Sequence, residues 1–455
     1  MDPATGQILK TVADATAADA LAALTAASHA QAGWARISAR ERAEFLRRAF
    51  DLLIARTETF ATLITLEMGK SLEEARGEVR YAAEFLRWFS EEAARIDGRY
   101  QIAPSGTLHQ IVSRKPVGPC LLITPWNFPL AMITRKAGPA IAAGCTMIVK
   151  PAELTPLTSL AFAAMMQETG LPDGVMNLIT TNRAPDAAGA LLEDTRLRKL
   201  SFTGSTRVGR LLLRGAARNI LRTSMELGGN APFIVCEDAD LDRAVDGAVQ
   251  AKLRNIGQAC TAANRFYVHE RQAKAFVARL AERFRAMPMG PGLAGEVIGP
   301  LINDAARQNV HALVLDAVSR GARLVTGGEI PNGDGYFYPP TLLADVPADT
   351  RIMREEIFGP VAPVQTFVDD KEAVELANDS DYGLAAYLFT ENLDRATRMS
   401  SALETGMLGI NTGLVSDAAA PFGGVKQSGL GREGGAEGIS EYLTTQYTGI
   451  ALPVR

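Results

Sequence analysis

Between about residues 117 and 228, short apolar runs alternate with amphipathic segments of helical period. The apolar runs have the length of strands and lack polar alternation, which is typical of strands covered on both faces. This β-α-β-α order predicts an α/β fold built on a parallel, doubly wound sheet. The predicted strands are "PCLLIT", "CTMIVK", "GVMNLIT" and "LRKLSF", and the predicted helices cover residues 129–143, 155–169, 186–193 and 205–217.

A second series with the same alternation begins at "APFIV". Its pattern predicts another doubly wound α/β domain. The predicted helices cover residues 240–254, 271–286 and 304–320, and the predicted strands are "RFYVH" and "ARLVTGG".

The remaining segments follow other patterns. The first hundred residues favour helices, and "SARE" at 38–41 is a capping-box pattern ahead of an apolar stripe. Residues 97–116 alternate partly and contain Gly and Pro breaks, which predicts an extended hairpin. "PFGGVKQSGLGREGG" predicts a loop, and the tail "EYLTTQYTGI" predicts a strand. Free strand edges pair with other chains, so we expect a homodimer or homotetramer.

Composition and charge narrow the classes of function. The 455 residues include 47 basic and 51 acidic side chains without a basic block, which argues against a nucleic-acid partner. The start "MDPATGQILK" lacks the apolar segment of a signal peptide, and no apolar run is long enough to span a membrane, so we expect a cytoplasmic protein without a membrane partner. Four cysteines without a C-x-x-C pair, and only four histidines, argue against a metal site, a disulfide framework and imidazole catalysis.

Three segments fall at the carboxyl ends of predicted strands, where doubly wound sheets bind ligands. "FTGSTRVGR" places Gly204 and Gly209 at a strand–helix turn that presents amides to an anion, although it matches neither a Walker A loop nor G-x-G-x-x-G. "IVKPAE" supplies Lys150 and Glu153, which can bind ribose hydroxyls, and a carboxylate there repels a 2′-phosphate. "ITPWNFPL" fixes the amide of Asn127 as an oxyanion donor. Taken alone, each has a structural alternative: a turn, a solvated strand end and a helix cap.

Cys260 differs from the other cysteines because its neighbours in "NIGQACTAANR" are polar and small. An accessible thiol is a candidate nucleophile. Glu226 in "MELGGN" has no basic neighbour in sequence and is a candidate general base if it shares the cleft. Singly, a cysteine more often packs in a core and a glutamate more often lies on the surface.

These motifs occur in an order that resembles the NAD(P)-dependent aldehyde dehydrogenase superfamily over essentially the whole chain. The matching motifs are "TPWNFPL", "KPAELTP", "FTGSTRVG", "MELGGN", "GQAC", "EEIFGP" and "PFGGVKQSGLGREGG". Longer phrases such as "ELGGNAPFIV" are most similar to the succinate-semialdehyde dehydrogenases. The resemblance implies a Rossmann-like NAD-binding domain, a catalytic domain and a small bridging β element for oligomerisation. We expect them to comprise residues 1–97 with 117–228, residues 229–428, and residues 98–116 with 429–455, respectively.

The resemblance also implies roles for matching residues. Cys260 matches the catalytic thiol, Glu226 the general base, and Asn127 the oxyanion donor that works with the Cys260 amide. The implied cofactor contacts are Thr124, Trp126, Lys150, Glu153, Gly204, Ser205, Gly209, Leu227, Glu356 and Phe358. Residues that match a site for the substrate's far carboxylate are Arg135, Arg254 and Ser416. Glu153 stands where NADP-preferring members often carry a smaller residue, so NAD is expected rather than NADP.

The implied reaction oxidises an aldehyde, most simply succinate semialdehyde, to its acid through a thiohemiacetal and a thioester on Cys260. Three alternatives remain: a dehydrogenase for glutarate semialdehyde or an uncharged aldehyde, a cysteine-dependent thioesterase or esterase, and a non-catalytic relative. Arg135 and Arg254 also have the alternative of structural salt bridges. Many relatives carry a second cysteine at the position of Ala262, so no local disulfide switch is expected here. Relatives also carry a hairpin ahead of the "DPATGQ" element, and this chain starts at that element.

Overall fold

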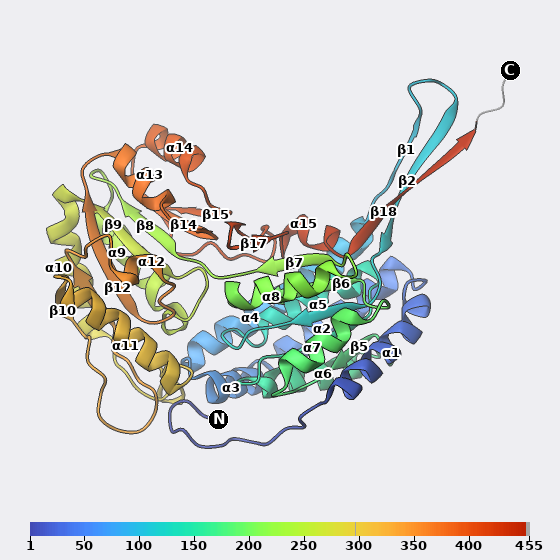
Figure 1. Cartoon of the computed structure of the whole chain (residues 1–455), viewed down its shortest axis with the longest axis horizontal. Helices are drawn as coiled ribbons and strands as arrows, with labels where there is room; N and C mark the ends of the chain where they lie inside the picture. Colours follow the sequence, from blue (N-terminus) through green and yellow to red (C-terminus); the bar gives the residue numbers. More distant parts are fainter. Residues whose placement is uncertain (296, 452–455) are drawn as a thin grey trace.

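Two α/β units and a projecting arm of strands make up the computed structural model, which describes residues 1–295 and 297–451 (Figure 1). The predicted fold class is therefore confirmed, since each unit is built on a largely parallel sheet. The arm projects from one end of the molecule, and the described chain ends on it.

The first unit contains a six-stranded sheet of order β17-β7-β6-β3-β4-β5, in which only β17 is antiparallel to its neighbour. Side chains of Leu121 and Ile148 pack on one face, while those of Leu122 and Val149 pack on the other, which explains the continuous apolar runs. The strands are β3 (Cys120–Ile123), β4 (Met147–Lys150), β5 (Met176–Leu178), β6 (Lys199–Thr203), β7 (Arg222–Glu226) and β17 (Gly429–Leu430).

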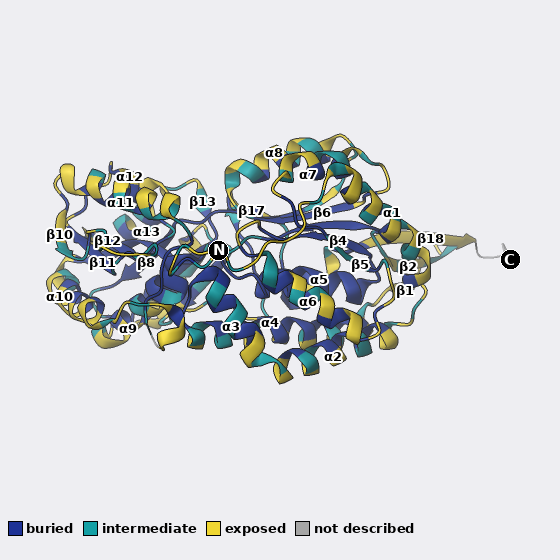
Figure 2. Cartoon of the chain, turned by 90° about the horizontal axis from the view of Figure 1, so that it is seen from below, coloured by how far each residue is buried: buried dark blue, intermediate teal, exposed yellow. Residues whose placement is uncertain are grey.

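Helices cover both faces of this sheet (Figure 2). One face carries α1 (Ala17–Trp34), α7 (Ala184–Glu193) and α8 (Thr206–Ala217). The other carries α2 (Ala39–Ala55), α3 (Thr57–Met68), α4 (Leu72–Glu92), α5 (Ala131–Ala143) and α6 (Pro156–Glu168). A 3₁₀ turn, Ala93–Arg95, follows α4. The Ser38 capping box is present at the start of α2, as its sequence indicates.

The second unit contains a seven-stranded sheet of order β10-β11-β12-β9-β8-β14-β15, in which only the β10–β11 pair is antiparallel. Its strands are β8 (Ala231–Val235), β9 (Ala263–His269), β10 (Arg323–Thr326), β11 (Thr341–Ala344), β12 (Val361–Phe367), β14 (Ala385–Phe389) and β15 (Met407–Ile410). Its helices are α9 (Leu241–Leu253), α10 (Glu270–Ala286), α11 (Asp304–Ser319), α12 (Arg351–Arg354), α13 (Asp370–Asn378) and α14 (Leu393–Ala402), with 3₁₀ turns at Arg254–Gly257 and Gly292–Ala294. The sequence analysis assigns no elements to residues 341–410, although seven of these elements lie there: β11, α12, β12, α13, β14, α14 and β15.

The arm is a three-stranded antiparallel sheet of β1 (Arg99–Ile102), β2 (Leu108–Pro116) and β18 (Leu443–Ala451). The hairpin and the tail strand occur where the sequence predicts them. Only part of residues 429–455 lies in the arm, because β17 joins the six-stranded sheet and α15 (Gly435–Ser440) packs against α5. The segment predicted as a loop contains β17 and also β16 (Val425–Lys426), which pairs with β13 (Tyr382–Gly383).

Candidate active site

Cys260 follows a strained turn between α9 and β9. Asn255 and Ile256 have φ angles of 56° and 61°, and Gly257 has a φ of 72°. A left-handed conformation costs a non-glycine residue on the order of 1–3 kcal/mol, so the surroundings must hold it. Asn255 donates its backbone N–H to Glu74 Oε1 at 2.6 Å and its side-chain amide to the Gln258 carbonyl at 2.8 Å. The turn therefore fixes the position of Cys260, which remains partly exposed.

The Cys260 thiol opens onto a cavity of about 230 Å³ between the two units. Most of its walls are residues that the sequence analysis assigns to cofactor or catalysis. The lining residues are Pro125, Trp126, Asn127, Met132, Thr203, Gly204, Ser205, Leu227, Gly228, Cys260, Glu356 and Phe358. The structure thus brings together residues from α5, from the end of β6, from the loops that follow β3, β6 and β7, and from the loops that precede β9 and β12.

Asn127 is buried, and both its side-chain amide and its backbone carbonyl are hydrogen-bonded. Its Nδ2 donates to the Gln258 carbonyl at 3.0 Å, which leaves its second N–H available for an oxyanion. The backbone carbonyl of Asn127 accepts hydrogen bonds from Lys70 Nζ at 2.9 Å and from Asn255 Nδ2 at 3.1 Å. Lys70 is in turn paired with Glu78 at 2.5 Å, and both side chains are buried. This support makes Asn127 a preorganised donor beside the thiol.

The thiol of Cys260 carries a proton at neutral pH. Burial raises its pKa to about 12, and the carboxylates of Glu356 and Glu226 act in the same direction, while Arg135 opposes them. Thiolate is the reactive form, so attack on a carbonyl requires a base or a nearby positive charge.

Glu226 ends β7 beside the cavity residues Leu227 and Gly228. Burial raises the pKa of its carboxyl well above the usual range, and the neighbouring Glu433 adds to this effect. Its Oε2 is buried and has no hydrogen-bond partner among the described residues. An unpaired buried carboxyl whose charge affects the thiol is suited to act as a base.

The residues expected to hold a dinucleotide lie along the carboxyl edge of the six-stranded sheet. Lys150 Nζ donates to the Pro151 carbonyl at 3.1 Å and pairs with Glu153, which is part exposed. Ser205 caps α8, so the first amides of that helix face the cavity. Thr124 adds a buried hydroxyl that has no partner within residues 1–295 and 297–451. Donors and acceptors of these kinds fit the ribose and pyrophosphate of a dinucleotide.

Two other expected cofactor contacts pack around the first turn of α8. Gly209 lies in α8, where a Cβ would approach Leu227 Cδ2 to 2.4 Å. A glycine is needed there for α8 to reach the end of β7.

On the opposite wall, Glu356 and Phe358 face Trp126. The rings of Trp126 and Phe358 meet edge to face at 5.3 Å, and Phe358 has a left-handed φ of 53°. Glu356 Oε1 accepts the backbone N–H of Gly229 at 3.2 Å. Burial raises the pKa of Glu356 to about 7, against the effects of the Gly229 amide and of Lys252.

The residues expected to bind the substrate's far carboxylate differ in their surroundings. Arg254 is half-buried, packs over the Phe128 ring at 5.1 Å, and has no ion-pair partner in the described part of the chain. Ser416 is partly buried near the Tyr81 hydroxyl. Arg135 is fully buried, and its Nε lies 2.9 Å from Glu433 Oε2. Its charge is therefore already paired, as the salt-bridge alternative anticipates.

Sequence reasoning missed several side chains that shape this site. Lys70, Glu78 and Asn255 support Asn127, and Tyr81 lies between Arg254 and Cys260 in electrostatic reach of both. Nothing in the local sequence marks them, because their partners lie far away in the chain or across a turn that only the fold defines.

No group of three or more His, Cys, Asp or Glu side chains among the described residues is arranged to hold a metal ion. Nor does any helix in residues 1–295 and 297–451 combine the length and apolar character needed to cross a bilayer.

Comparison with known proteins agrees with this geometry. Residues 1–448 match the aldehyde dehydrogenase family model. The chain is 61% identical over 447 residues to a succinate-semialdehyde dehydrogenase of Paenarthrobacter nicotinovorans, covering 98% of this chain and 99% of that protein. It is 47% identical to an NADP(+)-dependent succinate-semialdehyde dehydrogenase of Escherichia coli, covering 99% and 94%. Glutarate-semialdehyde dehydrogenases of two Pseudomonas species also match.

Among solved structures, an aldehyde dehydrogenase of Brucella melitensis biovar abortus superposes with a TM-score of 0.98 at 50% identity, covering 100% of this chain and 93% of that one. The match extends over both α/β units and the arm. The chain belongs to the aldehyde dehydrogenase family and is an NAD(P)-dependent oxidoreductase.

Proposed function

We propose that this enzyme oxidises succinate semialdehyde to succinate with NAD. One observation carries the proposal: the partly exposed Cys260 lines the cavity and is within electrostatic range of Arg254, a cation without an ion-pair partner among the described residues. A substrate with an aldehyde at one end and a carboxylate at the other can satisfy both.

In the proposed reaction, Cys260 Sγ bonds to the aldehyde carbon, and its proton passes to a base. The resulting oxyanion accepts hydrogen bonds from Asn127 Nδ2 and the Cys260 N–H. An oxidised nicotinamide, which Glu356 and Phe358 would hold, would accept the hydrogen of the former aldehyde carbon with its electron pair, and a thioester would remain on Cys260. Glu226 then takes a proton from water, the hydroxyl adds to the thioester carbon, and the C–S bond breaks to release the acid and restore the thiol.

For the far carboxylate we favour Arg254 and Ser416 as the principal ligands. Arg254 has unused donors, and charge-assisted contacts to a guanidinium can be bidentate. Arg135 is assigned a secondary role because it already pairs with Glu433. The high identity to a succinate-semialdehyde dehydrogenase supports this substrate over glutarate semialdehyde.

The preference for NAD rests on Glu153. Its carboxylate, paired with Lys150, would repel a 2′-phosphate and can accept ribose hydroxyls. The Escherichia coli relative is named as NADP(+)-dependent, so the preference needs its own test.

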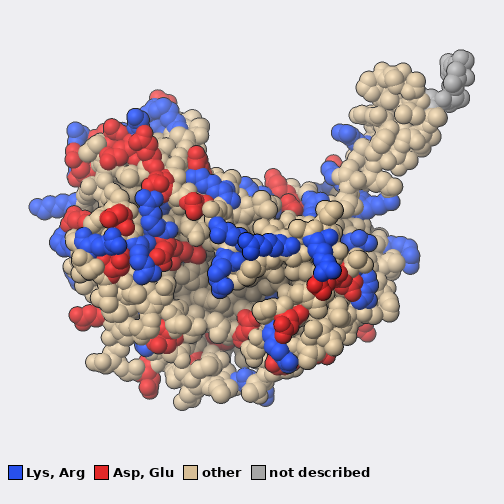
Figure 3. Space-filling model, in the orientation of Figure 1, with Lys and Arg blue, Asp and Glu red and all other residues tan. Residues whose placement is uncertain are grey.

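We further assign cofactor binding to residues 1–97 with 117–228, catalysis to residues 229–428, and oligomerisation to the arm. The outer arm is nearly free of charged side chains (Figure 3) and exposes Tyr100 and Tyr447 by 61% and 54%. A second copy of this chain would cover these rings, so a monomer in sedimentation would contradict the assignment. All four cysteines are free thiols, which supports a reducing cytoplasm, testable by cell fractionation.

The decisive experiment is a panel of aldehydes scored by formation of reduced cofactor, with NAD and NADP in parallel. Succinate semialdehyde with NAD should give the highest kcat/KM. A higher value for glutarate semialdehyde or an uncharged aldehyde would overturn the substrate, and a higher value with NADP would overturn the cofactor.

A further inference from the structure

Lys252 is a fully buried lysine that the proposed reaction does not use. It lies near the end of α9, and its Nζ donates to Asn264 Oδ1 at 2.9 Å. Among the described residues this neutral amide is its only hydrogen-bond partner, and no carboxylate lies within ion-pair distance. An apolar side chain could fill such a place at less cost in desolvation, so the charge calls for another explanation.

A chain of hydrogen bonds joins Lys252 to the cavity. Asn264, which accepts from Lys252, donates its Nδ2 to the Gly229 carbonyl at 3.4 Å. Gly229 in turn donates its N–H to Glu356 Oε1 at 3.2 Å. The ammonium is thus linked through Asn264 and both backbone polar groups of Gly229 to the carboxylate that faces the nicotinamide side.

Neighbouring atoms lie close to the backbone of Gly228 and Gly229. A Cβ at Gly229 would come within 2.3 Å of the Cys260 carbonyl oxygen, and one at Gly228 would come within 2.9 Å of Glu356 Oε2. A shift of this segment would therefore move the nucleophile's loop and the carboxylate together.

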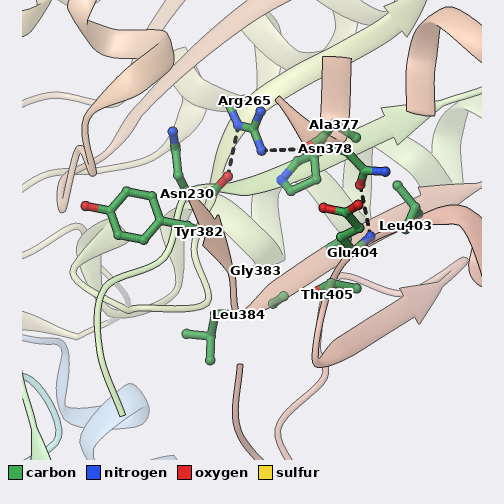
Figure 4. Close-up of a pocket in the computed structure, with 13 residues that line it drawn as sticks. Asn230, Arg265, Ala377, Asn378, Tyr382, Gly383, Leu384, Leu403, Glu404 and Thr405 are labelled. Carbon is green, nitrogen blue, oxygen red and sulfur yellow. Dashed lines mark hydrogen bonds between the residues drawn. The ribbon is translucent and has the colours of Figure 1, made fainter. Parts of the chain in front are cut away.

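Arg265 holds the next residue of the same segment. Its Nε donates to the Asn230 carbonyl and its Nη2 to the Ala377 carbonyl, both at 2.9 Å (Figure 4). Its Nη1 donates to the Leu376 carbonyl, also at 2.9 Å. The guanidinium of Arg265 thus donates to three backbone carbonyls. The ammonium of Lys252, in contrast, makes one hydrogen bond and has two N–H groups without a partner among the described residues.

The charges of Lys252 and Glu356 affect each other. Burial lowers the pKa of Lys252 to about 7, and the carboxylate of Glu356 opposes this. In return, Lys252 helps to keep Glu356 ionised against burial. An ionised carboxylate is the form that accepts hydrogen bonds from two ribose hydroxyls.

We propose that Lys252 is a positioning residue for the nicotinamide end of the cofactor: through Asn264 and Gly229 it orients Glu356, and its ammonium is the counter-charge of that carboxylate. This inference rests on the proposed role of Glu356 in cofactor binding. It assigns no contact between Lys252 and the substrate or the cofactor.

The test compares two activities of the full-length enzyme. Lys252→Met should raise the dissociation constant of NADH, measured by tryptophan quenching, by about tenfold or more, since a contact through a charged group is lost. Hydrolysis of 4-nitrophenyl acetate, which needs Cys260, Asn127 and Glu226 but no dinucleotide, should stay within about twofold. Equal loss of both would show a merely structural lysine and overturn the proposal.

A double-mutant cycle separates this inference from the proposed function. If Lys252 acts through Glu356, Lys252→Met should add nothing to the loss of NADH affinity already caused by Glu356→Gln. Additive losses would overturn the proposal. Full affinity in Glu356→Gln alone would instead overturn the cofactor role of Glu356.

Two further variants control for packing. Lys199→Met also buries a methionine in place of a buried lysine, one that donates to the Ser224 hydroxyl and lies 3.9 Å from Glu441 Oε2, and it should leave NADH affinity unchanged. An equal loss there would overturn the proposal. Asn264→Leu breaks the link while keeping Lys252 and should weaken NADH binding; unchanged affinity would contradict the pathway, even if Lys252→Met fails to fold.

Discussion

Arg135 and Glu433 form a buried ion pair in which the arginine Nε lies 2.9 Å from the carboxylate Oε2. The sequence analysis expects other roles for both: Arg135 as a ligand of the substrate's carboxylate, and Glu433 as part of the bridging element. The same carboxylate pairs with Lys136 and raises the pKa of Glu226. Arg135 therefore contributes to the electrostatics around Glu226, the proposed base, and Arg254 remains the proposed cation for the substrate's carboxylate.

The first prediction follows from this difference between the two arginines. Arg254→Gln should raise KM for succinate semialdehyde about 10- to 100-fold, because a charge-assisted contact is lost. KM for butanal, which lacks the carboxylate, should change little. Steady-state kinetics with both aldehydes measure this directly.

Arg135→Gln is the matched comparison. It leaves Glu433 with one fewer cation in a buried site, so it should lower the unfolding midpoint in urea, whereas Arg254→Gln should not. Equal KM increases for succinate semialdehyde and butanal in Arg254→Gln would refute the clamp.

The nucleophile gives the second prediction. Cys260→Ser should reduce the formation of reduced cofactor by about a thousandfold or more, as loss of a nucleophile does elsewhere. NADH binding, followed by tryptophan quenching, should be unchanged because the cavity wall is intact. A variant that retains the parent rate would rule out a thioester on Cys260.

The raised pKa of Cys260 gives the third prediction. A thiol with a pKa of about 12 is protonated at neutral pH, so in the cofactor-free enzyme its thiolate fraction grows with pH. Alkylation by iodoacetamide should accelerate about tenfold for each pH unit between pH 7 and 10. Mass spectrometry of the Cys260 peptide reports the rate, and a plateau near neutral pH would mean that the thiolate already predominates.

How far the sequence determines this structure depends on the range of the interactions. Helix α8 and the strand before it follow from local pattern, and Cys260, Asn127 and Glu226 follow from motifs that resemble a family. The Lys70–Glu78 pair could not be predicted, because two charged residues in a helical region ordinarily lie in solvent. They are buried because Glu78 on α4 lies against the start of α5, where it accepts from Leu130 and Ala131, and Lys70 reaches the Asn127 carbonyl.

The same limit applies to backbone conformation. Nothing in "RNIGQ" predicts left-handed Asn255 and Ile256, since Gly257 alone favours such a turn. Their strain is offset by hydrogen bonds to groups that are remote in the sequence, such as Glu74. Residues 429–451 likewise form β17 in the six-stranded sheet, the helix α15 and the arm strand β18. Tertiary contacts, which the local sequence does not show, determine these different partners.

The buried pair Lys70–Glu78 supports a stability prediction. Glu78→Ala removes the counter-charge of a buried lysine and the acceptor of the Leu130 and Ala131 N–H groups, so it should lower the free energy of unfolding by about 3–5 kcal/mol. It should also lower kcat, because Lys70 holds the carbonyl of Asn127. Urea unfolding and steady-state kinetics measure the two effects.

Glu168 provides the surface comparison. It is paired with Arg56 at 2.6 Å, but the two side chains are 38% and 49% exposed. Glu168→Ala should therefore leave both the urea unfolding midpoint and kcat nearly unchanged. If the two variants lost equal stability, burial would not be what gives the Lys70–Glu78 pair its importance.

The last prediction concerns the choice of cofactor at Glu153. Replacing this carboxylate by a hydroxyl, Glu153→Ser, removes the negative charge next to the expected ribose and frees Lys150 to meet a 2′-phosphate. Coulomb repulsion is replaced by attraction, so kcat/KM with NADP should rise about tenfold or more. With NAD it should fall modestly, because an acceptor for the ribose hydroxyls is lost. Glu193→Ser, at a solvent-exposed carboxylate paired with Arg218, should alter neither value. An unchanged NADP/NAD ratio in Glu153→Ser would place the determinant of cofactor preference elsewhere in the cavity.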